Sequence, residues 1–328
     1  MARRSIAAGM IALVAVCAGP GAADMRHPQA VTVDPVVLRD GSAGGTIVRV
    51  SFPATGHNLP LVILSHGNRL SRTDYQPLVT ALVRNGYVVV QPDHRDATIG
   101  GFVPAAPQPE DVWRTRIAQI RWIADHPQAV ARLVPALRGR IDATRIAIVG
   151  HSFGGQTAAL AMGATIVAPE DGRRKAYPAP AIRVAVLLAP PGHDAGLTPE
   201  WKRRAPYLKL DWTTMRGPVL TINGMADMTP LTSQGPGWHD DPYRLGPTRG
   251  AFCLVRLPQV GHYLGGIDTP LRLPAGDATP ERQARVIGTT IAFLDAGLGR
   301  KTGAASDWPR RRADATCREG AAASITPP

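Results

Sequence analysis

The sequence lacks long apolar runs beyond its first residues. After that segment, no stretch approaches the roughly 18 uncharged apolar residues that a helix needs to cross a bilayer. We therefore expect no integral membrane segment in the mature chain.

Metal-binding patterns are also missing. The nine histidines show neither H-x-x-x-H nor H-E-x-x-H spacing, so a zinc site has little support in the sequence. We expect neither a metal nor an organic cofactor.

Lysine is scarce in a chain that is otherwise basic. The formal net charge is +12, yet only four of the 37 basic residues are lysine. Short basic clusters at residues 173–175, 202–204 and 310–312 have no nucleic-acid-binding module around them, which favours solvated faces over a nucleic-acid partner.

The first residues have the composition of a leader for export. Arg3-Arg4 precede an apolar segment at Ile6 to Val16, and Gly21-Ala22-Ala23 resembles a cleavage site. We expect a signal peptide at residues 1–23 and a secreted or periplasmic protein that begins at Asp24. The paired arginines leave a twin-arginine route and an ordinary secretory route open.

Cleavage there would leave two cysteines, Cys253 and Cys317. An oxidising compartment favours a disulfide between them, which would pin a C-terminal tail at residues 301–328 to the preceding domain. One buried and one exposed free thiol is the alternative.

Strands and helices alternate along residues 24–300, which we interpret as one catalytic domain. Two extended segments, Ala30 to Val37 and Thr46 to Phe52, come first, and later strands are continuous apolar runs separated by helical patterns. The expected fold class is α/β, with a mostly parallel, doubly wound sheet, helices on both faces, and an insertion at about residues 190–216 between the sixth and seventh strands.

The hexapeptide Gly-His-Ser-Phe-Gly-Gly at residues 150–155 follows the strand Ile146 to Val149 and precedes a helix of small residues. This is the context of a nucleophile elbow, in which glycines let strand and helix pass close to an exposed serine, here Ser152. A glycine-rich turn between a strand and a helix is the alternative.

A serine nucleophile needs a histidine base, and that histidine needs a carboxylate. His262 and Asp227 each follow a predicted strand and fit these roles, with Asp194 as the reserve acid. Both could instead be ordinary loop residues.

Two backbone N–H groups are expected to form the oxyanion hole. Asn68 lies in the turn Ser65-His66-Gly67-Asn68 after a strand, and Phe153 follows the nucleophile at the start of its helix. For His66 we favour hydrogen bonds to neighbouring loop backbone over a chemical role.

The order of elements, the elbow GHSFGG and the turn SHGN resemble the α/β-hydrolase superfamily over roughly residues 30 to 300. Residues 92–96, PDHRD, resemble the platelet-activating-factor acetylhydrolase and dienelactone-hydrolase-like esterases, with a weaker similarity to chlorophyllase-like enzymes. Serine at 152 departs from the cysteine of dienelactone hydrolases, which favours ordinary ester hydrolysis. His94, Arg95 and Asp96 could also form a simple polar loop.

These observations predict a serine carboxylic-ester hydrolase that acts through an acyl-enzyme on a small-molecule or lipid-like ester. Acyl transfer to an alcohol or peroxide, or a catalytically silent binding protein of the same fold, are the rivals. Trp201, Leu208 and Trp212 in the insertion are candidates for an apolar substrate pocket, although they could equally pack a surface helix.

Overall fold

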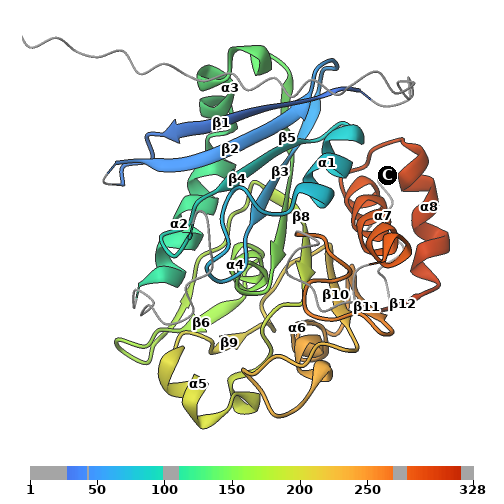
Figure 1. Cartoon of the computed structure of the whole chain (residues 1–328). Helices are drawn as coiled ribbons and strands as arrows, with labels where there is room; N and C mark the ends of the chain where they lie inside the picture. Colours follow the sequence, from blue (N-terminus) through green and yellow to red (C-terminus); the bar gives the residue numbers. More distant parts are fainter. Residues whose placement is uncertain (1–27, 43, 99–110, 269–278, 319–328) are drawn as a thin grey trace, which may run out of the picture.

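The computed structural model describes residues 28–42, 44–98, 111–268 and 279–318 (Figure 1). The predicted signal peptide at residues 1–23 lies outside the described residues. In the described ranges, no helix is both long and apolar enough to cross a membrane.

The chain opens with an antiparallel hairpin. Strands β1 (Ala30–Leu38) and β2 (Thr46–Pro53) pair with Val33 opposite Val50, and β2 continues antiparallel onto β4 (Val88–Pro92). The hairpin thus forms the antiparallel end of a larger sheet.

The centre of that sheet is parallel. Within the described residues, nine strands pair in the order β1-β2-β4-β3-β5-β8-β10-β11-β12. The strands not yet introduced are β3 (Leu59–Ser65), β5 (Ile141–His151), β8 (Ile182–Leu188), β10 (Val219–Gly224), β11 (Phe252–Leu257) and β12 (Ala315–Cys317). From β4 to β11 all neighbours run parallel, so their carboxyl ends meet at one edge.

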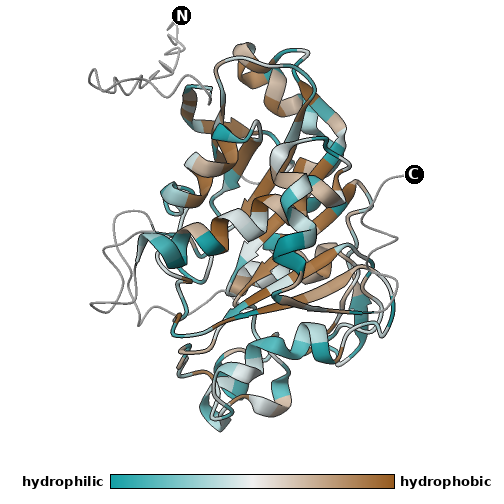
Figure 2. Ribbon diagram, turned by 90° about the vertical axis from the view of Figure 1, so that its right-hand side faces the viewer, coloured by the Kyte–Doolittle hydropathy of each residue, from teal (hydrophilic) through white to brown (hydrophobic). Residues whose placement is uncertain are grey.

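Helices cover both faces of the sheet (Figures 1 and 2). One face packs against α2 (Val112–Asp125), α3 (Pro127–Leu133) and α4 (Phe153–Ala161), and the other against α1 (Gln76–Arg84) and α7 (Pro280–Gly297).

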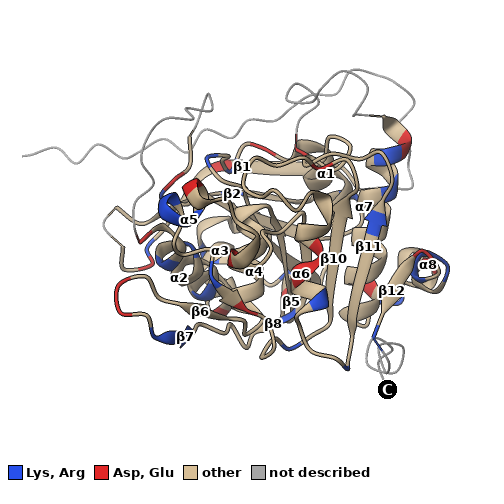
Figure 3. Ribbon diagram, turned by 90° about the horizontal axis from the view of Figure 1, so that it is seen from below, with Lys and Arg blue, Asp and Glu red and all other residues tan. Residues whose placement is uncertain are grey.

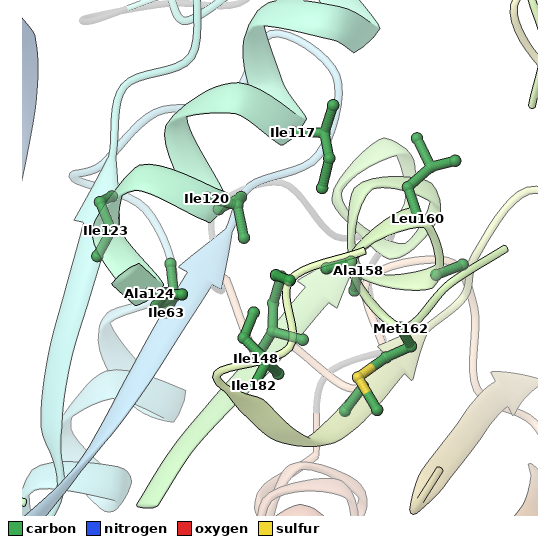
Figure 4. Close-up of a cluster of buried hydrophobic side chains, with 14 of the residues drawn as sticks. Ile63, Ile117, Ile120, Ile123, Ala124, Ile148, Ala158, Leu160, Met162 and Ile182 are labelled. Carbon is green, nitrogen blue, oxygen red and sulfur yellow. The ribbon is translucent and has the colours of Figure 1, made fainter. Parts of the chain in front are cut away.

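Strand β3 shows why both faces are apolar. Leu61 and Ile63 belong to the core under α2 and α4, while Val62 and Leu64 belong to the core under α1 and α7. Figure 4 shows Ile63 and Ile148 of the sheet facing Ile120 of α2. The predicted fold class is confirmed.

The predicted sixth and seventh strands are β8 and β10. Between them lie a short helix η2 (Asp194–Gly196), α5 (Pro199–Arg204) and β9 (Leu210–Asp211). Strand β9 pairs with β6 (Thr165–Val167), which pairs with β7 (Arg174–Ala176) in a separate small sheet. Three further short helices are η1 (Pro135–Leu137), η3 (Pro236–Asp240) and α6 (Asp241–Arg244).

The described part of the predicted C-terminal tail is structured. It forms α8 (Gly303–Arg312), whose Trp308 contacts Phe293 of α7 edge to face, and then β12. The basic end of α8 is visible in Figure 3. Cys317 of β12 is bonded to Cys253 of β11, so the structure contains the predicted disulfide.

Candidate active site

Ser152 lies at the turn between β5 and α4. Its backbone has φ 54° and ψ −121°, and the first residue of α4 follows immediately. A Cβ at Gly150 would lie 2.1 Å from the Gly154 carbonyl oxygen, and one at Gly154 would lie 2.0 Å from that of Ser65. Both positions therefore require glycine, as the elbow interpretation expects.

Two loops from the carboxyl edge of the sheet bring His262 and Asp227 to this serine. The N–H groups of Met225 and Ala226 donate to the carbonyl oxygens of Leu257 and Val260, each at 2.9 Å. These backbone bonds join the loop after β10 to the loop after β11, so the two side chains lie side by side.

The three side chains form a hydrogen-bonded chain. His262 Nε2 lies 3.0 Å from Ser152 Oγ, and His262 Nδ1 lies 2.7 Å from Asp227 Oδ2. Since a carboxylate only accepts, Nδ1 donates to Asp227 and Nε2 is left to accept from the serine hydroxyl. Ser152 and His262 are partly exposed, whereas Asp227 is fully buried.

The electrostatics of Asp227 favour its charged form. Burial alone would raise the pKa of this carboxyl, but its contacts with His239 and His262 outweigh burial and hold the pKa well below its usual range. Asp194, the reserve acid, lies in η2 with its carboxylate 3.2 Å from the His193 ring. The structure thus brings Asp227 to His262 and leaves Asp194 elsewhere.

The two residues predicted to supply oxyanion donors follow neighbouring strands of the sheet. Ser65 and Gly150 are paired neighbours on β3 and β5, and Asn68 and Phe153 each follow three residues later. Phe153 opens α4, where the N–H groups of the first turn point out of the helix.

Arg116 of α2, which no sequence motif singles out, braces the turn that carries Asn68. Its fully buried guanidinium donates to the carbonyl oxygens of His66 (2.7 Å) and Gly67 (3.2 Å). The same guanidinium forms a bidentate ion pair with Asp96. Asp96 in turn accepts from the Arg69 N–H at 3.2 Å. The ion pair therefore contacts the backbone on both sides of Asn68.

The PDHRD segment is thus more than a polar surface loop. Asp96 belongs to the buried ion pair, and His94 is buried between Ser65 Oγ (2.8 Å) and Gln119 Oε1 (2.7 Å). Arg95, by contrast, is exposed and pairs with Asp111.

The other histidines near Ser152 serve as braces. His66 Nδ1 lies 2.7 Å from the Gly67 carbonyl oxygen, and burial lowers the pKa of His66 to about 3, so the ring is neutral. Burial likewise lowers the pKa of His151 to about 3. The Tyr75 hydroxyl accepts from the Gly67 N–H (2.9 Å) and contacts His151 Nδ1 (2.8 Å), while His151 Nε2 lies 2.9 Å from the His262 carbonyl oxygen.

The candidate pocket residues differ in exposure. Trp212 and Leu208 are buried in the core under α2 and α4, where they pack against apolar neighbours, while Trp201 is partly exposed at the edge of that core. Tyr207, which the sequence did not single out, stacks on Phe153 with ring centres 5.3 Å apart.

Metal-ligand atoms converge at one place in the described residues. One atom each of Asp227, His239 and His262 lies within 4.8 Å of the others. Asp227 Oδ2 lies 2.7 Å from His262 Nδ1, in a hydrogen bond, and 3.0 Å from His239 Nε2, at ion-pair distance. We therefore interpret these three side chains as an array of charge-paired groups.

Similarity to known proteins covers part of the chain. The family described as Chlorophyllase matches residues 24–169. Platelet-activating factor acetylhydrolase of Cavia porcellus is 28% identical over 31% of this chain and 31% of the relative, and that of Bos taurus is 29% identical over 31% and 32%. Chlorophyllase type 0 of Chenopodium album is 30% identical over 40% of this chain and 38% of the relative.

The chain spans about a third of the length of the curated relatives it matches. The matched family region contains Asn68 and Ser152 and ends before Asp227 and His262. Together with the sheet and its two helical layers, these similarities lead to one conclusion: the chain has the α/β-hydrolase fold and is similar to the serine esterase group of that superfamily.

Proposed function

We propose that this chain is a serine hydrolase of carboxylic esters that works through an acyl-enzyme. The observation that carries the proposal is the hydrogen-bonded chain from Ser152 Oγ through His262 to the buried Asp227, at 3.0 and 2.7 Å. A base within hydrogen-bond reach of a hydroxyl and oriented by a carboxylate is the arrangement that turns serine into a nucleophile.

In the proposed reaction, Ser152 Oγ attacks the ester carbonyl carbon while His262 Nε2 takes the hydroxyl proton. The N–H groups of Asn68 and Phe153 hold the oxyanion of the tetrahedral intermediate. When the intermediate collapses, His262 returns the proton to the departing alcohol. Water, deprotonated by the same imidazole, then releases the acid and restores Ser152. The reaction needs only groups of the chain, the ester and one water molecule.

The relatives support an ester substrate. An acetylhydrolase and a chlorophyllase are the proteins that the chain resembles, and both names denote hydrolases. We therefore propose a small-molecule or lipid-like ester. A panel of p-nitrophenyl esters of increasing acyl length would define the acyl group that the site prefers.

We also propose that the protein acts outside the cytoplasm, in the periplasm or after secretion. The leader pattern of residues 1–23 supports export, and the bond between Cys253 and Cys317 is of a kind that persists in oxidising compartments.

Labelling with a fluorophosphonate tests the proposed nucleophile. Wild-type protein should be labelled, and Ser152→Ala should lose labelling together with at least ~10³-fold in kcat, because the attacking oxygen is gone. Ser306→Ala, a change at an exposed serine of α8, is the control and should keep both. Labelling that persists in Ser152→Ala would contradict the proposal.

A further inference from the structure

A second histidine contacts the carboxylate of the site. His239 lies in η3, between β10 and β11, and its side chain is 2% exposed. Its Nε2 is 3.0 Å from Asp227 Oδ2, the same oxygen that lies 2.7 Å from His262 Nδ1. Asp227 is therefore held between two imidazole rings, of which the proposed reaction uses one.

The other nitrogen of His239 fixes where its proton lies. Nδ1 is 2.6 Å from the carbonyl oxygen of Pro190, and a carbonyl oxygen can only accept, so Nδ1 carries a hydrogen. Nε2 lies 3.0 Å from Asp227 Oδ2, at ion-pair distance but without the alignment of a hydrogen bond, so a neutral ring would leave this buried nitrogen unsatisfied and place its lone pair close to the carboxylate. A second proton on Nε2 turns this contact into an attraction between opposite charges.

The other charged groups around His239 are already paired. Asp240 accepts from Asn223 and Arg256, and Asp241 accepts from the His193 N–H. The rings nearest to His239 are Trp238, which is uncharged, and His262. Two further titratable side chains, His151 and Tyr263, contact His262. Burial lowers the pKa of His151 so that its ring is neutral. Asp227 is thus the carboxylate that His239 faces.

We propose that His239 is a positioning residue of this site. As an imidazolium it fixes the Asp227 carboxylate and balances its charge. Asp227 then orients the neutral His262 ring without favouring a second proton on Nε2 of that ring. This inference rests on the proposed function for its catalytic meaning. Its structural content, a buried histidine cation between η3 and the loop after β10, stands independently of that function.

The consequence concerns the pH at which His262 becomes a base. An uncompensated carboxylate stabilises the protonated form of its partner histidine, whereas a carboxylate shared with a second cation does so less. With His239 charged, His262 gives up its proton, and Ser152 becomes reactive, at a lower pH than it otherwise would.

The pH profile of kcat/KM in His239→Gln tests this. Glutamine keeps a side-chain amide that can donate to Pro190 but carries no charge, so the acid limb should move to higher pH by about one unit. His126→Gln is the matched control, because His126 is exposed and packs on Trp122; its limb should stay in place. If the acid limb of kcat/KM in His239→Gln coincided with that of wild type, the proposal would be overturned, because a purely structural role would leave the acid limb in place.

Nitrogen NMR of histidine-labelled protein tests the charge without any assay of activity. At pH 8, wild type should show one histidine with both ring nitrogens in the imidazolium range, and this signal should be absent from His239→Gln. Wild-type spectra in which every histidine is neutral would refute the proposal even if the variant failed to fold. Loss of fluorophosphonate labelling from wild type would instead count against the proposed function and leave this result untouched.

Discussion

At the residue scale, Ser152 holds a backbone conformation that side-chain-bearing residues rarely adopt. A φ of 54° in a non-glycine residue costs about 1–3 kcal/mol and persists where its surroundings fix it. Here the Ser152 N–H donates to Leu188 of β8 at 2.8 Å, and Gly150 and Gly154 close the turn from both sides. The position of the serine hydroxyl is therefore set by the backbone of the sheet.

The carboxylate of Asp227 is expected to control the pH at which the proposed reaction begins. In Asp227→Asn, His262 loses the charge that favours its protonated form, so the acid limb of kcat/KM should move to lower pH. The plateau should also fall, by up to ~10⁴-fold, because the amide supports the wrong tautomer of the imidazole. A pH series of kcat/KM measures both effects, and the limb shift is opposite in sign to that expected for His239→Gln.

Asp194→Asn is the matched control for this prediction. Asp194 also follows a strand of the sheet, but it lies beside His193. The acid limb and the plateau of kcat/KM in Asp194→Asn should therefore equal those of wild type. If Asp194→Asn were impaired and Asp227→Asn were not, the acid of the site would be Asp194.

At the element scale, the proximity of Ser152, Asp227 and His262 was predictable from sequence because each residue follows a strand of a parallel sheet. Parallel strands place their carboxyl ends at one edge, so residues as far apart as Ser152 and His262 are brought together by topology alone. Arg116 and His239 gave no such signal. Arg116 lies within an amphipathic helix, where an arginine is usually solvated, and His239 lies in a short helix without periodicity.

Removing the cation that braces the turn at residues 65–68 should destabilise the fold. Arg116→Met leaves Asp96 buried and unpaired, which we expect to cost about 3–5 kcal/mol in the free energy of unfolding. Arg95→Met breaks an exposed ion pair with Asp111 and should cost less than about 1 kcal/mol. Urea unfolding of the two variants at pH 7 measures the difference, and equal midpoints would contradict the assigned role.

The same ion pair fixes a pH dependence of stability. Burial would raise the pKa of Asp96, but Arg116 and the hydrogen bonds between them hold it well below its usual range. A carboxyl whose pKa is lower in the folded than in the unfolded chain stabilises the fold at pH values above its unfolded pKa of about 4. This contribution is lost as the pH falls below that value. The difference in the free energy of unfolding between wild type and Arg116→Met should therefore become smaller below about pH 4.

At the scale of the whole molecule, the central sheet was predictable and its additions were not. Continuous apolar runs such as Leu61 to Leu64 indicate buried strands directly. The small sheet is built from strands of two or three residues, and its pairing of Thr165 with Asp211 depends on contacts far apart in sequence. Helix α8 contains Pro309 in its interior, and this residue argues against a helix when the sequence is read alone.

The bond between Cys253 and Cys317 should stabilise the molecule more than it affects the reaction. It joins residues 64 apart, for which chain entropy suggests about 4 kcal/mol. Reduction should lower the Tm clearly while specific activity at 25 °C changes little, because the bond joins β11 to β12 and does not include the loops that carry Asp227 and His262. Unreduced denatured protein from an oxidising compartment should show no free thiol.

The variant Cys253→Ala/Cys317→Ala provides the control, because its Tm should match that of the reduced wild type and should not respond to reductant. Two titratable thiols in the unreduced protein, or a Tm that reductant leaves unchanged, would contradict this prediction.

The strand β12 covers one edge of the central sheet. Five of the six residues of β11 are buried, and on the side away from β10 its backbone pairs with the three residues of β12 and accepts from the Arg318 N–H. An uncovered β11 would offer unpaired N–H and C=O groups along an apolar strand, which is a template for edge-to-edge aggregation. Because a three-residue strand contributes few hydrogen bonds, the disulfide to β11 and the packing of α8 on α7 should help to keep this edge covered.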